Sequence, residues 1–173
     1  MNIAINTVVF LITLAGMEAF AWYAHKYVMH GWGWGWHKSH HEPRDGWFET
    51  NDLYAVVFAG VAIALIALGT AGWHPLEWVG AGMTAYGFLY FLAHDGLVHR
   101  RWPFRYVPRR GYLKRLYQAH LMHHAVQGRD GCVSFGFLIA PSTATLKKQL
   151  RALHDGPLHK TTSEASATER RGA

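Results

Sequence analysis

The sequence has a single cysteine, and two long stretches have no lysine or arginine at all. One cysteine, Cys132, excludes an intrachain disulfide. Residues 1–24 lack the positive charge with which a cleavable signal peptide begins, so we expect the first apolar run to be retained. No G-x-G-x-x-G motif follows a predicted strand, which argues against a nicotinamide- or flavin-binding domain within the 173 residues.

Three apolar runs carry almost no charge. They cover residues 3–24, 53–73 and 76–93, and their only charged residues are Glu18 and Glu77. A helix needs roughly 20 apolar residues to cross the hydrocarbon core of a membrane, so two runs are long enough and the third nearly is. A soluble domain this small would hardly need three such helices. We therefore predict an all-α, polytopic integral membrane protein with three to four transmembrane helices.

Positive charge orients these spans. All 17 lysines and arginines lie in residues 25–52 and 94–173, which three spans place on one side of the membrane. The positive-inside rule makes that side cytoplasmic and the N-terminus external. Residues 132–140 are too short to cross, but they are apolar enough to enter the membrane as a re-entrant segment. Residues 1–153 are thus expected to form the membrane domain, and the polar residues 154–173 a disordered tail.

Ten of the 13 histidines fall into four clusters with a repeated spacing. The clusters read H-x4-H, H-x2-H-H, H-x4-H and H-x2-H-H. Their members are His25, His30, His37, His40, His41, His94, His99, His120, His123 and His124. All ten lie at or beyond the cytoplasmic ends of the first and third spans. The other three, His74, His154 and His159, fall outside the pattern, and we exclude them as ligands.

Regular helix geometry accounts for the spacing in two of the four clusters. At about 100° per residue, the three histidines of an H-x2-H-H cluster share one helix face, whereas those of an H-x4-H cluster differ by about 140°. The latter pairs either flank a metal cluster lying between helices or are brought together by a local bulge. Imidazole binds iron, zinc, copper and nickel. Because a structural zinc takes about four ligands, ten histidines predict two metal ions in a cytoplasmic, histidine-rich site, with four or five ligands each.

The histidine clusters resemble those of the membrane-bound fatty acid hydroxylase superfamily, which are non-haem di-iron oxygenases. Within it, HDGLVHRRWPF (94–104) and HLMHHAVQGRDGCVSFGF (120–137) resemble the bacterial β-carotene hydroxylases. The resemblance implies that the ten histidines bind two irons, with zinc able to substitute in preparations. It further implies O₂ as co-substrate, electrons from reduced ferredoxin, and a location in the bacterial inner membrane.

The resemblance also implies the reaction. C3 of each β-ionone ring of β-carotene would be hydroxylated, giving β-cryptoxanthin and then zeaxanthin, and canthaxanthin would give astaxanthin. A fatty acid or sterol hydroxylase or desaturase of the same superfamily is the alternative. From another class, a histidine-rich metal transporter would need polar residues along its spans, which the second and third runs almost lack. The sequence leaves the substrate preference and the oligomeric state open.

Two acids outside the clusters are candidates for holding ligands in place. Glu18 lies within a span, where an acid is costly unless paired. It either orients a histidine from another helix or makes a helix–helix hydrogen bond. Asp95 lies four residues before His99, so on a helix the two face the same way. This carboxylate either holds the His99 ring or is a simple surface acid.

The remaining candidates concern the substrate and the electron donor. Carotene has no hydrogen-bonding group, so an apolar slot must select the position of attack by its shape. Aromatic residues just before His94 are candidates for lining that slot, or for core packing: Phe88, Tyr90 and Phe91. Residues 100–110 concentrate five arginines, where an acidic ferredoxin or anionic lipid would dock. The docking candidates are Arg105, Arg109 and Arg110. Nucleic-acid binding is not expected, because membrane topology already explains the charge.

Overall fold

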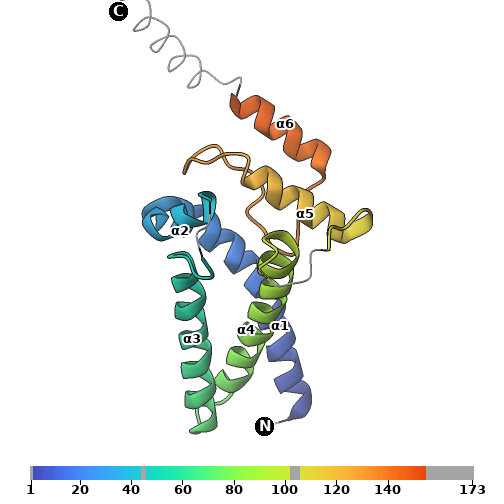
Figure 1. Cartoon of the computed structure of the whole chain (residues 1–173). Helices are drawn as coiled ribbons and strands as arrows, with labels where there is room; N and C mark the ends of the chain where they lie inside the picture. Colours follow the sequence, from blue (N-terminus) through green and yellow to red (C-terminus); the bar gives the residue numbers. More distant parts are fainter. Residues whose placement is uncertain (1, 44–45, 102–105, 155–173) are drawn as a thin grey trace, which may run out of the picture.

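The computed structural model describes residues 2–43, 46–101 and 106–154, and within these ranges it is all-α, as expected. Three long helices lie side by side: α1 (Ile3–Tyr23), α3 (Asp52–Thr70) and α4 (Leu76–Tyr90) (Figure 1). The shorter helices gather at the end of this bundle opposite the N-terminus. They are α2 (Trp34–His41), α5 (Gly111–His123) and α6 (Thr143–His154).

Among the described residues, two helices are long and apolar enough to cross a membrane, by length and composition. They are the continuous helix Ile3–Trp32 and Asp52–Thr70. Only 6% and 11% of their most apolar windows are buried, so apolar side chains such as Ile12 and Ile63 point outward. A core helix of a water-soluble protein would bury such side chains. The expected third span, 76–93, begins with α4, whose 15 residues fall short of that length, so this span stays a prediction.

α4 approaches both other long helices through two glycines. A Cβ atom at Gly80 would lie 2.6 Å from the carbonyl oxygen of Ala62 in α3. A Cβ atom at Gly82 would lie 2.9 Å from the carbonyl oxygen of Phe10 in α1. Any side chain would therefore push the helices apart. Small residues at such contacts are typical of helices that associate within a membrane.

Both H-x4-H clusters lie in π-helical turns that continue the long helices. η1 (Ala24–Trp32) follows α1, and η2 (Phe91–Val98) follows α4. At the end of η2 the backbone N–H of His99 donates to the carbonyl oxygen of His94, five residues earlier, at 2.9 Å. The wider π turn brings residues i and i+5 together. The ring centroids are consequently 5.2 Å apart for His25 and His30, and 4.6 Å apart for His94 and His99. Of the two alternatives for this spacing, the local bulge is present.

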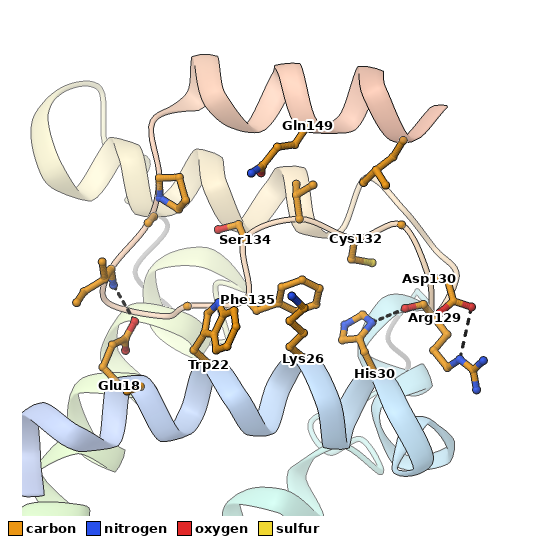
Figure 2. A pocket seen from close by; sticks show the side chains of 18 of the residues that line it. Glu18, Trp22, Lys26, His30, Arg129, Asp130, Cys132, Ser134, Phe135 and Gln149 are labelled. Atoms are coloured by element: carbon orange, nitrogen blue, oxygen red, sulfur yellow. Dashed lines mark hydrogen bonds and ion pairs between the residues drawn. The ribbon is translucent and has the colours of Figure 1, made fainter. Parts of the chain in front are cut away.

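Residues 126–142 form an irregular connection between α5 and α6, which we call the 126–142 segment. It lies between α1 and α6 (Figure 2). A small core of Leu116, Ala119, Val133, Ala140 and Leu146 joins it to α5 and α6. The segment includes residues 132–140, whose entry into the membrane stays a prediction. Of the expected tail, His154 ends α6, and residues 155–173 lie outside the described ranges.

Candidate metal centre

The four histidine clusters meet where α1 and α4 end, and they form two groups. We call them the first and second histidine groups. Within each group, the four ligand atoms lie within 4.8 Å of one another. The first histidine group is His25, His30, His37 and His123; the second is His40, His94, His99 and His120. All but His99, which is half-buried, are buried.

Each H-x2-H-H cluster is divided between the two groups. In α2, His37 belongs to the first group and His40 to the second, and in α5 His123 and His120 are divided in the same way. The last histidine of each cluster completes the arrangement. His41 lies beside the first group, with its ring 5.0 Å from that of His30, and the Nε2 of His124 lies 2.9 Å from the Nε2 of His120 in the second. Two groups of five are thus formed, as two ions with four or five ligands each would require.

The hydrogen bonds of the rings show which nitrogen is free to bind a metal. In seven of the ten histidines, Nδ1 faces an oxygen that can only accept a hydrogen bond, so Nδ1 must carry the proton. In the neutral ring, Nε2 is then a bare lone pair. Burial is the largest cause that keeps these rings neutral: it lowers the pKa of His37 to about 3 and that of His41 to about 4.

Bare lone pairs face each other in three pairs of these histidines. The Nε2–Nε2 distances are 3.2 Å for His25 with His37, 3.1 Å for His30 with His123, and 3.0 Å for His40 with His94. No proton is left to join these nitrogens, so they repel each other unless a cation lies between them. Two imidazoles bound to one ion at about 2.05 Å lie about 2.9 Å apart at a right angle and about 3.3 Å apart at the tetrahedral angle. The donors and their spacing therefore fit a transition-metal ion such as iron or zinc in each group.

The backbone of the 126–142 segment holds four of the rings. Its carbonyl oxygens accept the Nδ1 protons at 2.8–3.1 Å. The pairs are His25 with Phe135, His30 with Arg129, His41 with Val126, and His123 with Val133. Such partners fix the tautomer and orientation of a ligand. Sequence reasoning missed them because any residue supplies a carbonyl.

Side chains hold three further rings. Asn51 Oδ1 accepts from His37 at 2.7 Å, and Glu49 Oε1 accepts from His40 at 2.9 Å. Asp95 does hold a histidine, but the ring is that of its neighbour His94, at 2.7 Å, where His99 was expected. Since η2 is a π turn, the α-helical spacing behind that expectation does not apply. Glu49 and Asn51 were missed, although the polar stretch ETND (49–52) just before an apolar run is a signal that could have found them.

A half-buried arginine, Arg101, pairs with these carboxylates. It forms ion pairs with Glu49, with Asp52 at 2.7 Å and with Asp95 at 3.7 Å. Glu49 and Asp95 are the acceptors for two rings of the second histidine group, so Arg101 neutralises the charge that orients that group. Its place among five arginines in residues 100–110 gave no sign of this separate role.

Glu18 contacts a backbone turn and another helix. Its Oε1 accepts backbone N–H bonds from Phe137, Leu138 and Ile139 at 2.8–3.0 Å, and its Oε2 accepts the hydroxyl of Tyr86 on α4 at 2.7 Å. Figure 2 shows Glu18 reaching from α1 to the 126–142 segment. Of its two expected roles, the helix–helix hydrogen bond is therefore present. The three amide contacts were not anticipated.

An apolar cavity of about 440 Å³ lies between α1, α3 and α4. Its walls include Met17, Phe58 and Met83, and it reaches Asp95 and Phe137 beside the histidines. Of the aromatic candidates, Tyr90 and Phe91 line it. The Tyr90 ring also stacks on His94, with centroids 4.5 Å apart. Phe88 is not among the lining residues and is 61% exposed.

The other candidates lie away from this centre. Arg109 and Arg110 are exposed just before α5, whereas Arg105 lies outside the described residues. His74 pairs with Glu77 at 2.5 Å at the start of α4, far along the chain from the clusters. His159 also lies outside the described residues.

Ten converging histidines at the end of an apolar helical bundle define a class of membrane-associated metalloenzyme. The chain matches the fatty acid hydroxylase family over residues 10–141, and it belongs to that family. As a member it is an oxidoreductase, and the resemblance read from the histidine clusters is confirmed.

Individual relatives of the chain are named as carotene hydroxylases. A β-carotene hydroxylase of Pantoea ananas is 67% identical over 149 residues, which cover 86% of this chain and 85% of the relative. One from Pseudescherichia vulneris is 63% identical, covering 88% and 87%. The chloroplastic β-carotene 3-hydroxylase 1 of Arabidopsis thaliana is 40% identical over 73% of this chain and 41% of its own length. No solved structure matches the chain.

Proposed function

We propose that this chain hydroxylates C3 of the β-ionone rings of β-carotene, giving β-cryptoxanthin and then zeaxanthin, in carotenoid biosynthesis. The observation that carries the proposal is the apolar cavity that ends at the second histidine group. It offers an apolar molecule a place beside a metal centre. The choice of β-carotene as substrate is supported by bacterial relatives at 58–67% identity, all named β-carotene hydroxylase.

The ten clustered histidines would hold two irons, one in each histidine group, with zinc able to replace them in preparations. Two irons, O₂ and two electrons supply an oxidant strong enough for an unactivated methylene group. The protein keeps the ligand nitrogens unprotonated through the carbonyl and carboxylate acceptors at Nδ1. The protein also limits the access of water to the ligand nitrogens, because eight of the ten histidines are buried.

The substrate would enter from the lipid, since α1 and α3 expose apolar side chains around the cavity. A carotene offers nothing to hydrogen-bond, so the cavity walls alone would orient the ring. Tyr90 and Phe137, whose ring centroids are 4.7 Å apart, lie between the cavity and the histidines. We assign them the task of placing C3 against the second histidine group. Canthaxanthin, with the same carbon skeleton, would be taken in the same way and lead to astaxanthin.

The membrane arrangement follows from the same proposal. Residues 3–24, 53–73 and 76–93 would cross a bacterial inner membrane with the N-terminus external. The N-terminus and the α3–α4 turn lie at one end of the bundle (Figure 1). Helices α2 and α5, which carry histidines of both groups, lie at the other end, and this arrangement supports the topology. Electrons would come from a reduced ferredoxin on the cytoplasmic side, docking at Arg105, Arg109 and Arg110.

Pigment analysis tests the function directly. Bacterial cells that make β-carotene are given the wild-type gene or a His40→Ala variant, with the protein level checked in both. We expect β-cryptoxanthin and zeaxanthin with the wild type, and unchanged β-carotene with the variant. Unchanged β-carotene with a stable, iron-loaded wild-type protein would refute the proposal. Hydroxylated or desaturated fatty acids or sterols in those cells would then favour the alternative within the family.

A further inference from the structure

The first histidine group has a second set of ligands beside it. The ligand atoms of this set also lie within 4.8 Å of one another. The set is His30, His41, His123 and Cys132. It shares His30 and His123 with the first histidine group, and the Nε2 atoms of these two are 3.1 Å apart. An ion therefore has two neighbouring positions across a common edge, one with four nitrogens and one with three nitrogens and a sulfur.

The ring of His41 is a second observation that points to an ion on this side of the first histidine group. Its residue is 6% exposed, and its Nδ1 donates to the carbonyl oxygen of Val126 at 3.1 Å. That bond leaves Nε2 as a bare acceptor. Within the described part of the chain, this buried Nε2 has no hydrogen-bond partner. A buried polar atom without a partner is costly, and a metal ion at this position would satisfy it.

The 126–142 segment fixes the sulfur in the same place. Cys132 is 8% exposed, and its thiol contacts the carbonyl oxygens of Gly128 at 3.5 Å and Val126 at 3.8 Å. Val126 thus holds both His41 and Cys132. Figure 2 shows His30 reaching from η1 toward the stretch of the segment that carries Cys132. The position of the thiol is therefore set by the backbone that also orients the histidines.

We propose that Cys132 completes a competing site, His30–His41–His123–Cys132, that takes a thiophilic divalent cation, above all Zn²⁺. Imidazole and thiolate are both ligands of tetrahedral zinc sites, and sulfur favours zinc over harder ions. On binding, the thiol releases its proton to water and a metal–sulfur bond forms, without any change of oxidation state. The inference rests on the proposed metal binding by the histidines.

The shared ligands make the two positions mutually exclusive. An ion bound to Cys132 takes His30 and His123, so the first histidine group keeps only His25 and His37 of its four members. Zinc at the competing site would therefore exclude iron from the first group while leaving the second group untouched. The enzyme would be inhibited by zinc at one of its two metal positions.

Cobalt(II) is the probe that tests the assignment. The full-length protein is purified in detergent, freed of metal with a chelator, and titrated with Co²⁺. Because the chain has one cysteine, any thiolate-to-cobalt charge-transfer band in the near ultraviolet must come from Cys132. We expect this band in the wild type and its loss in Cys132→Ser and Cys132→Ala. Ser134→Ala, which removes a buried hydroxyl without a partner among the described residues, is the matched control and should keep the band.

The outcomes of the cobalt titration distinguish the role of Cys132 from metal binding by the histidines. Visible cobalt bands of histidine coordination without the charge-transfer band would refute the role of Cys132 and leave the histidine centre standing. A protein that takes up no Co²⁺ would refute both.

Zinc displacement gives a second measurement. Zn²⁺ added to the iron-loaded wild type should displace about half of the iron, and Cys132→Ser should need at least about tenfold more zinc for the same loss. Should the variant not fold, alkylation of the wild-type thiol decides the matter. Zinc should protect Cys132 from the reagent, and an unchanged alkylation rate would overturn the proposal.

Discussion

Replacing Glu18 should loosen the 126–142 segment and, through it, the first histidine group. Glu18→Ala removes the acceptor of three backbone N–H groups and of the Tyr86 hydroxyl. A buried donor left without a partner costs about 1–3 kcal/mol. Leu138 and Ile139 are only half-buried or exposed, so water can replace part of this loss, and we expect about 3–5 kcal/mol in total.

Two milder variants should lower the stability by smaller amounts than Glu18→Ala. Glu18→Gln keeps an oxygen toward the amides but loses the charge, which roughly halves the strength of such bonds, so about 2 kcal/mol is expected. Tyr86→Phe removes one hydrogen bond and should cost about 1 kcal/mol. The stability of the purified protein in detergent should therefore fall in the order Tyr86→Phe, Glu18→Gln, Glu18→Ala.

Metal analysis completes this experiment. The carbonyls of Val133 and Phe135, which hold His123 and His25, lie just before the amides that Glu18 binds. Glu18→Ala should therefore lose metal from the first histidine group more readily than from the second. A variant that unfolds like the wild type and keeps its full metal content would show that Glu18 does not position the segment.

Four further predictions follow from the site. His40→Ala and His123→Ala should each abolish hydroxylation and lower bound metal from about two ions to about one per chain, whereas His159→Ala should keep both; equal damage by His159→Ala would contradict the choice of ligands. Arg101→Met should cost about 3 kcal/mol in a denaturation assay and release metal from the second group, because it removes the cation that pairs with three partly buried carboxylates. Gly87→Leu should block the cavity and lower turnover of β-carotene with unchanged metal, whereas Gly60→Leu, equally free of contacts but outside the cavity, should not. Neutralising three arginines together should slow ferredoxin-supported turnover and flatten its dependence on salt, while metal content stays unchanged. The reason is that salt screens the attraction between these arginines and an acidic donor over a Debye length of about 8 Å at physiological ionic strength. The three are Arg105, Arg109 and Arg110.

The histidines that converge in the structure could be predicted from the sequence because their spacing is a local property. Helix geometry relates residues three to five positions apart whatever the rest of the chain does. The same local reasoning identified the bulge as one way to close an H-x4-H pair, and the π turns at His25–His30 and His94–His99 are that bulge. It failed at Asp95, because an α-helical spacing was applied to a π turn.

Long-range partners could not be predicted in this way. His25 and the carbonyl of Phe135 are separated by 110 positions, and Glu18 and the amide of Ile139 by 121. A backbone group has no sequence signature, so its pairing depends on how the 126–142 segment crosses α1. The ion pairs of Arg101 depend likewise on the approach of α3 to η2.

The sequence by itself determined the apolar helices, the clustering of the ten histidines and the family, because composition and residue spacing do not depend on how the chain packs. Tertiary structure alone decided which histidines lie in the same group, since His37 and His40 face different groups from one helix. It also brought Cys132 within reach of histidines from three different clusters. These contacts arise from packing between segments far apart in the chain, where small changes in helix approach decide which atoms meet.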